Sequence, residues 1–250
     1  MYKKFKDFIS RKFNPKGYYA AGGGKIYPKD IAELDALVND PETNLADIII
    51  PKRITDLSKL FLKTKRTDFS GLETWDVFHV TDMNHMFYRC KTFTGKEIEN
   101  WDVSSVRDFW GIFSECENFD ADLSKWKFGV LNSCSEMFAF CEKFTGKGLE
   151  NWDTSRVKNM DQMFYRCKNF TGKPIENWNV KNVENMEQMF HQCENFDADL
   201  SRWDLSSLKK ARSIFHLTKN KNIPNNFLKK FEEFSYSEKE HDTPQEYFIR

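Results

Sequence analysis

The residues best suited to chemistry in this chain are its six cysteines. Five of them recur at a nearly constant interval, at Cys90, Cys116, Cys141, Cys167 and Cys193. Protein metal sites usually need close pairs such as C-x-x-C, and none occurs. Neighbouring repeats could bring two cysteines near enough for a disulfide, but each lies on an apolar stripe, as a small buried hydrophobe would. We therefore predict buried free thiols and no metal site.

The five histidines form no catalytic constellation. They stand at His79, His85, His191, His216 and His241, without an H-E-x-x-H pair or a triad-like cluster, and we expect them to be scattered over the surface. The stretch AAGGGKIY, residues 20–27, lacks the spacing and the hydroxyl of a phosphate-binding loop and is expected to be a linker. The sequence thus predicts no catalytic residue, no cofactor and no enzymatic activity.

The composition narrows the choice of partners. Lys plus Arg and Asp plus Glu both number 38, so no overall field attracts nucleic acid or an anionic membrane. No apolar run reaches the roughly 18 residues of a membrane span, and the start of the chain lacks the apolar core of a secretory signal. We expect a cytoplasmic protein. The alternative is export to the cell surface or to a host by a route that the sequence does not reveal.

The elements that must position any site follow from an internal repeat. Six of the seven tryptophans are spaced by 25 or 26 residues, at Trp75, Trp101, Trp126, Trp152, Trp178 and Trp203. A phenylalanine column keeps the same interval from Phe61 to Phe215. A fixed period of about 26 residues is typical of repeat architectures in which each unit covers its neighbours. We expect these rings to lie one above the next along one continuous interior.

Each repeat carries two patterns. From Val157 to Cys167 the apolar residues are spaced by 3, 4 and 3, which predicts about three turns of helix. Gly172 then marks a turn, and Ile175 to Trp178 is long enough only for a short strand. The predicted fold is an α/β repeat, a leucine-rich-repeat-like solenoid with one short parallel strand and one short helix per coil of about 26 residues, closed by helical caps.

Three segments follow from these patterns. Residues 1–44 are predicted to hold a basic segment and a capping helix opened by Pro28 and Asp30, residues 45–217 the repeat array, and residues 218–250 a second cap helix and a tail. The nine residues CENFDADLS occur twice, at 116–124 and at 193–201, 77 residues apart. This identity indicates duplication of a block of three coils and needs no active site to explain it.

Four aromatic residues are candidates for a partner-binding surface. Trp110 lies off the tryptophan column, where other repeats carry polar residues, so it should point outward. Tyr88 and Tyr165 occupy an outward position one turn further on, and Phe140 is nearby. Exposed rings of this kind are typical of interfaces. The alternative, that the four rings only cover neighbouring apolar side chains, stays open.

A second candidate surface is acidic. Aspartates follow four of the tryptophans directly, whereas Lys127 and Asn179 interrupt the column: Asp76, Asp102, Asp153 and Asp204. Stacked carboxylates about 5 Å apart would repel one another unless they were solvated or hydrogen-bonded to backbone. We favour hydrogen bonding in turns over a docking stripe for a basic partner.

The segment ENWDTSRVKNMDQMFYRCKNFTGKPIENW, residues 150–178, resembles the BspA-like bacterial surface-protein repeat, a relative of the leucine-rich repeats. That resemblance implies a repeat protein with a binding role, often in adhesion, and carries over no catalytic residue. We therefore expect a non-enzymatic protein-interaction module with a protein partner. The alternatives are a bacterial adhesin or host-directed effector, and an inhibitor or immunity protein that blocks another protein.

Overall fold

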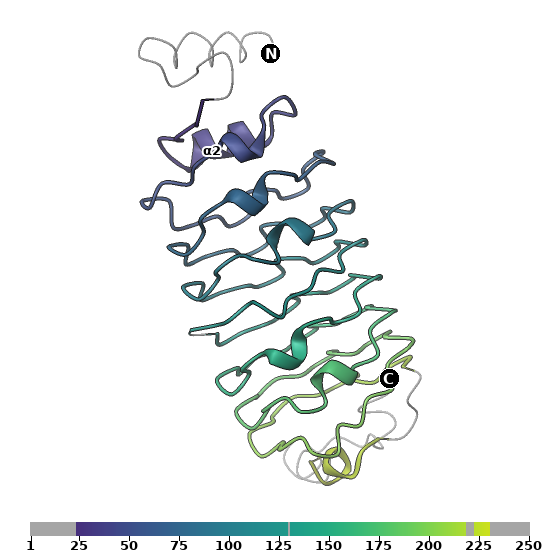
Figure 1. Ribbon diagram of the computed structural model, residues 1–250. Coiled ribbons are helices and arrows are strands. Elements are labelled where there is room, and N and C mark those ends of the chain that lie inside the picture. Colours follow the sequence, from purple (N-terminus) through teal and green to yellow (C-terminus); the bar gives the residue numbers. More distant parts are fainter. Residues whose placement is uncertain (1–23, 130, 219–222, 231–250) are drawn as a thin grey trace.

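The computed structural model describes residues 24–129, 131–218 and 223–230. The chain winds in coils that stack one above the next, as Figure 1 shows. We number the coils 1 to 7 by one interior residue of each: Phe61, Phe87, Phe113, Phe138, Phe164, Phe190 and Phe215. The start of the predicted segment 1–44 with its basic residues, the first half of the predicted linker and the predicted tail lie outside the described residues.

The predicted unit of one strand and one helix per coil is wrong. The described residues contain no β-strand, only isolated parallel bridges. Their α-helices are α2, Ile31–Val38, and a short helix at residues 225–230. The remaining regular elements are single 3₁₀ turns: η1 (Leu45–Asp47), η2 (Leu72–Thr74), η3 (Lys96–Ile98), η4 (Leu149–Asn151) and η5 (Lys173–Ile175). The coils are therefore built almost entirely from turns.

A ribbon of turns replaces the predicted helix of each coil. In coil 5 the N–H of Gln162 donates to Glu187 O of the next coil at 2.9 Å, and that of Met163 donates back to Met160 O at 3.2 Å. Phe164 again donates to the next coil. Alternate N–H groups thus join neighbouring coils, whereas in an α-helix they would all be satisfied within the segment. We call this segment, residues 159–167 in coil 5, the turn ribbon.

The turn ribbon explains why the apolar spacing predicted a helix. Each three-residue turn returns the chain to the interior, so buried residues recur every three or four positions, much as on a helix. Two left-handed residues per coil make the turns possible; in coil 5 they are Gln162 (φ 52°) and Arg166 (φ 59°). Glycine usually marks such positions, but thirteen non-glycine residues occupy them among the described residues. The turns therefore could not be predicted from the positions of glycine.

The predicted strand position is also occupied by a turn. Ile175 ends the 3₁₀ turn η5, and the Trp178 N–H donates back to Ile175 O. The parallel bridges lie instead at the start of the turn ribbons, for example Asn159 with Asn185. They join coils 1 to 3 and coils 4 to 7, but none joins Asp108 of coil 3 to Ser133 of coil 4. The ladder of bridges is therefore interrupted between coil 3 and coil 4, where one three-coil block ends and the next begins.

Stacked rings fill the interior along the whole array. The numbered phenylalanines of successive coils lie 5.2 to 6.1 Å apart, with interplanar angles of 6° to 20°. The six periodic tryptophans are 1 to 6% exposed, which confirms their predicted burial. Each also donates its Nε1–H to a backbone carbonyl of the preceding coil, as Trp178 does to Leu149 O at 2.8 Å. The column is thus a ladder of hydrogen bonds as well as of rings.

The repeated stretch CENFDADLS has a packing role. Its alanines, Ala121 and Ala198, are buried, and they face Gly95 and Gly172 of the coil before. A Cβ added at Gly95 would lie 2.3 Å from the Phe119 ring and 2.9 Å from Ala121 Cβ. Both glycines also have positive φ. A coil that contains CENFDADLS therefore packs well only on a coil with glycine at the position of Gly95 or Gly172.

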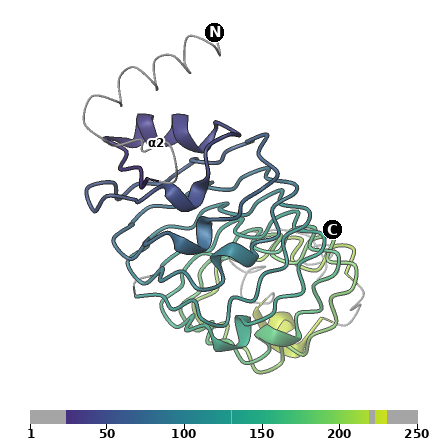
Figure 2. The ribbon, with the colours of Figure 1, turned by 45° about the horizontal axis from the view of Figure 1, so that its top comes forward.

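Both ends of the stack are covered, as Figure 2 shows from a second direction. The helix α2 begins after Asp30, whose carboxylate accepts the Glu33 N–H, so the predicted cap helix is confirmed. Before the first coil, Ile26 and Ile48 form one isolated parallel bridge. At the other end Phe227, in the helical residues 225–230, packs edge-on against Phe215 at 5.2 Å.

Candidate interaction surface

The outward side chains of the turn ribbons form one surface, which we call the ribbon face. All four aromatic residues predicted as partner contacts lie on it: Tyr88, Trp110, Phe140 and Tyr165. They fall into two clusters. The first surrounds Trp110 in coils 2 and 3, and the second runs from Phe140 through coils 5 to 7.

Trp110 is the centre of the first cluster. Its side chain is 45% exposed, whereas the six periodic tryptophans are at most 6% exposed. The His85 ring meets it edge-on with centroids 4.6 Å apart, and the Tyr88 ring meets His85 at 5.4 Å. Three aromatic rings on two coils therefore form a continuous and partly solvated surface.

Polar contacts hold Trp110 in place. Its backbone N–H donates to the side chains of Asn84 and Asp108, each at 2.9 Å, and its indole N–H reaches Glu136 Oε1 at 3.3 Å. The next residue, Gly111, has φ 57°, and a Cβ there would lie 3.1 Å from the His85 ring. Glycine at this left-handed position therefore lets His85 lie close to the backbone beside Trp110.

Tyr88 is tied to the neighbouring coil by a charged pair. Its hydroxyl donates to Glu115 Oε1 at 2.5 Å, and Arg89 Nε donates to Glu115 Oε2 at 2.7 Å. The hydrogen bond to the carboxylate raises the pKa of the Tyr88 hydroxyl above its ordinary value. The Arg89 guanidinium lies 5.1 Å from the Tyr88 ring centroid, so the ring is held between two charges.

The second cluster is a stack of rings on successive coils. Phe140 lies 5.2 Å from Tyr165, Tyr165 4.7 Å from His191, and His191 4.4 Å from His216. Arg166 lies 5.3 Å from the Phe140 centroid. The prediction of scattered surface histidines is therefore wrong for His191 and His216, which stand one repeat apart and stack.

Some polar atoms of this cluster are buried without a hydrogen-bond partner among the described residues. They are Arg166 Nε, His191 Nδ1 and Gln192 Oε1. Burial, and next the neighbouring charge of His216, lowers the pKa of His191 to about 4. At neutral pH the His191 ring is therefore uncharged, and it stacks on Tyr165 as an aromatic group.

The aspartates that follow the tryptophans lie in turns on another part of the coil. Each accepts the backbone N–H two residues further on at 3.0 to 3.2 Å, and Asn179 does the same in the coil that lacks aspartate. All four are exposed: Asp76, Asp102, Asp153 and Asp204. The hydrogen bonds from the serine hydroxyl and N–H two residues on lower the pKa of Asp102 and Asp153. Turn formation therefore accounts for the column.

The cysteine column is a second hydrogen-bond ladder. All six thiols are buried and free, as predicted, and each periodic thiol donates to a phenylalanine carbonyl of the preceding coil, as Cys167 does to Phe138 O at 2.9 Å. Burial raises the pKa of Cys90 to about 12 and also raises the pKa of the other five thiols. Thiols held in this form are poor nucleophiles.

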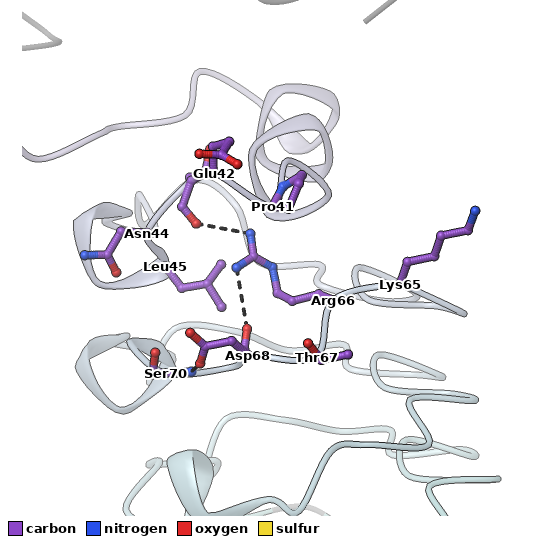
Figure 3. Close-up of a pocket in the computed structure, with 10 residues that line it drawn as sticks. Pro41, Glu42, Asn44, Leu45, Lys65, Arg66, Thr67, Asp68 and Ser70 are labelled. Atoms are coloured by element: carbon purple, nitrogen blue, oxygen red, sulfur yellow. Dashed lines mark hydrogen bonds between the residues drawn. The ribbon is translucent and has the colours of Figure 1, made fainter.

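A polar pocket of about 480 Å³ lies where α2 meets the first coils, shown in Figure 3. Its central side chain is Arg66. The guanidinium donates to three backbone carbonyls, that of Val38 at the end of α2 and those of Asp40 and Thr43 beyond it, at 2.6 to 3.1 Å. Its NH1 reaches Asp68 O at 3.5 Å. Because these carbonyls occupy its donors, Arg66 fastens the cap to the array and is poorly placed to bind an anion.

Among the described residues, no group of three or more His, Cys, Asp or Glu side chains is placed to hold a metal ion. No helix in that part of the chain is long and apolar enough to cross a membrane.

The comparison with known proteins agrees with the two-block organisation. A family model described as "Mycoplasma protein of unknown function, DUF285" matches residues 55–147 and again residues 132–240. The chain belongs to the DUF285 family. The two DUF285 matches begin 77 residues apart, the interval between the two copies of CENFDADLS. No curated protein and no solved structure matches the chain.

Three contacts on the ribbon face of this DUF285 chain were not predicted from the sequence. They are the contact of His85 with Trp110, the stacking of His191 on His216, and the hydrogen bond from the Trp110 indole to Glu136. The signal was present in the period, because His191 and His216 are 25 residues apart and Trp110 and Glu136 are 26 apart. Applying the repeat to the outward positions as well as to the core would have found these contacts.

Proposed function

We propose that this chain is a non-enzymatic interaction module that binds a protein partner through the ribbon face. The binding surface is centred on the first cluster, with Trp110, His85 and Tyr88 as its aromatic contacts. The coil stack holds these rings in fixed relative positions, so little side-chain freedom is lost on binding. The backbone bonds between coils 2 and 3, such as His85 N to Trp110 O at 2.9 Å, supply that rigidity.

The exposure of Trp110 carries the proposal. A tryptophan that is 45% exposed leaves a large apolar area in water, and tryptophan is strongly enriched among residues that dominate interfaces. The packing of the interior does not require this ring, because the periodic tryptophans fill that role. Its contacts with His85 and Glu136 hold it in one orientation on the surface.

The chemistry of the described side chains supports binding over catalysis. The thiols are buried with raised pKa, and Arg66 is occupied by backbone carbonyls. The histidines of the ribbon face contact other aromatic rings: His85 meets Trp110 edge-on, and His191 stacks on His216. A rigid surface of aromatic rings suits recognition.

Affinity capture from the native cell, with the full chain as bait, tests this proposal. Trp110→Ala should remove the captured partner. Phe78→Ala is the matched control, because Phe78 is 57% exposed but lies four residues before the turn ribbon. Retention of the partner by Trp110→Ala and its loss from Phe78→Ala would contradict the proposal, as would turnover of a substrate by the purified chain.

A further inference from the structure

One stripe of the ribbon face is strongly acidic although the whole chain has zero net charge. The stripe consists of three positions per coil: the residue at the bridge position and those two and three residues after it. In coil 2 these are Asp82, Asn84 and His85. Across coils 2 to 6 the three positions hold five carboxylates and no lysine or arginine: Asp82, Asp108, Glu136, Asp161 and Glu187. Lysine or arginine occupies these three positions only in the flanking coils, as Lys59 in coil 1 and as Lys210 and Arg212 in coil 7.

The carboxylates of the stripe remain unneutralised. None of the five forms an ion pair within 4.0 Å with a described residue, whereas other charged columns pair across coils. Lys91 with Glu117 and Lys168 with Glu142 are examples, at 2.6 and 2.7 Å. Several other charged columns are thus paired between coils, whereas the acidic stripe is not.

The stripe carboxylates also act on one another. Burial raises the pKa of Asp161, and the charges of Glu187 and Glu136 add to that effect. Burial likewise raises the pKa of Asp82, and the charges of Asp56 and Asp108 add to that effect, whereas the Asn84 N–H and the charge of Lys59 oppose it. Like charges held together in this way gain from a cation that approaches them.

We propose that the acidic stripe binds a lysine- and arginine-rich segment of a protein partner. This inference rests on the proposed function and specifies the chemistry of the partner. Trp110 stands in the middle of the stripe, with Asp108 bonded to its backbone N–H and Glu136 bonded to its indole. A guanidinium on the exposed indole face would gain a cation–π contact and lie near both carboxylates. Nucleic acid would be repelled by the same charges.

A charge-neutralising variant can be chosen that retains the hydrogen bonds of these turns. Asp82 and Asp108 each accept the backbone N–H two residues on, and Asn159 does the same in coil 5. The stripe variant is therefore Asp82→Asn, Asp108→Asn and Glu136→Gln. The control variant, Asp102→Asn, Asp153→Asn and Asp204→Asn, removes three carboxylates from the column in which Asn179 is already accommodated. Both variants change the net charge by the same amount.

The probe is a fluorescent peptide with six arginines separated by glycine and serine, with its glutamate counterpart as the negative control. Fluorescence anisotropy at low and at physiological ionic strength should show binding of the arginine peptide to the full chain, weaker at the higher salt. The stripe variant should bind about tenfold more weakly and the control variant within about twofold of wild type. Equal weakening in both variants, or no binding to wild type, would overturn the inference.

Partner capture by the Trp110→Ala variant and by the stripe variant distinguishes failure of this inference from failure of the proposed function. If Trp110→Ala loses the native partner but the stripe variant retains it, the ribbon face binds a partner whose recognition does not depend on basic residues, and the inference alone fails. Sedimentation of the purified chain tests a second copy as the occupant. Self-association that the stripe variant abolishes, without binding of the arginine peptide, would overturn the inference in favour of a homo-oligomer.

Discussion

Coils 1 to 3 and coils 4 to 6 form two blocks in which equivalent residues lie 77 positions apart, and the two blocks resemble each other more closely in the interior than on the surface. Inside, Phe87 and Phe164, or Trp101 and Trp178, make the same contacts. Outside, Trp110 corresponds to Glu187 and Ser114 to His191. Packing holds the interior to one pattern, whereas the ribbon face differs between the blocks. The difference indicates where specific recognition can be built without disturbing the stack.

The largest effect should come from removing one interior indole in each block. Trp101→Ala and Trp178→Ala each create a cavity and remove the indole hydrogen bond to a carbonyl, that of Leu72 or Leu149, which keeps only a backbone N–H donor. We expect each variant to lose about 3–5 kcal/mol of unfolding free energy. Chemical denaturation followed by circular dichroism measures the loss. A difference of more than about 2 kcal/mol between the two would show that the block interiors are not equivalent.

A smaller loss should follow from filling the glycine contacts. In Gly95→Ala and Gly172→Ala the new Cβ would lie 2.2 to 2.3 Å from a phenylalanine ring, at positive φ. We expect about 1–3 kcal/mol of destabilisation in each. Gly111→Ala is the control, because its Cβ would meet the His85 ring at 3.1 Å and the equivalent positions of other coils carry non-glycine residues. A larger loss for Gly111→Ala would contradict this account of the packing.

The pH dependence of stability should differ between the two blocks, because the second block has His191 where the first has Ser114. The folded protein holds the pKa of His191 at about 4, against an ordinary value of 6.5, so the unfolded chain binds more protons between these values. His191 therefore contributes stability above pH 6.5 that is lost as the pH falls toward 4. His191→Ser introduces the residue found at Ser114 and removes this contribution. Urea midpoints at several pH values should fall less steeply in the variant, and parallel curves would contradict the prediction.

The smallest effect on stability should come from the exposed indole. Trp110→Ala removes a ring that is 45% exposed and one hydrogen bond of 3.3 Å, so we expect a change below about 1 kcal/mol. Thermal melting compares this variant directly with Trp101→Ala. A loss as large as that of the interior tryptophan would mean that Trp110 has a packing role.

The period, the buried columns and the helix after Asp30 could be predicted because each follows from a single local signal. Tryptophans at a constant interval must share one environment, and they do. The backbone inside each coil could not be predicted in the same way. An interval of three or four residues fits a helix and a chain of turns equally, and non-glycine residues such as Gln162 conceal the left-handed positions. Bonds between coils decide between the two, and they are not a local property.

The candidate surface was predictable in part. Trp110 and Tyr88 were found because they break or repeat a pattern at outward positions. The contacts of Trp110 could not be predicted, because they come from Asn84, Asp108 and Glu136 on three different coils. Such contacts depend on the register between coils, which the turn ribbon sets. The acidic stripe depends on the same register, which the bridge positions define.

Site-specific photo-crosslinking tests the central claim most directly. A benzophenone amino acid at position 110 replaces the exposed indole on the ribbon face, and the same group at position 78 replaces an exposed ring outside it. In native cells we expect a discrete crosslinked protein from position 110 and none from position 78. Crosslinking from position 78 alone would contradict the assignment of the ribbon face as the binding surface.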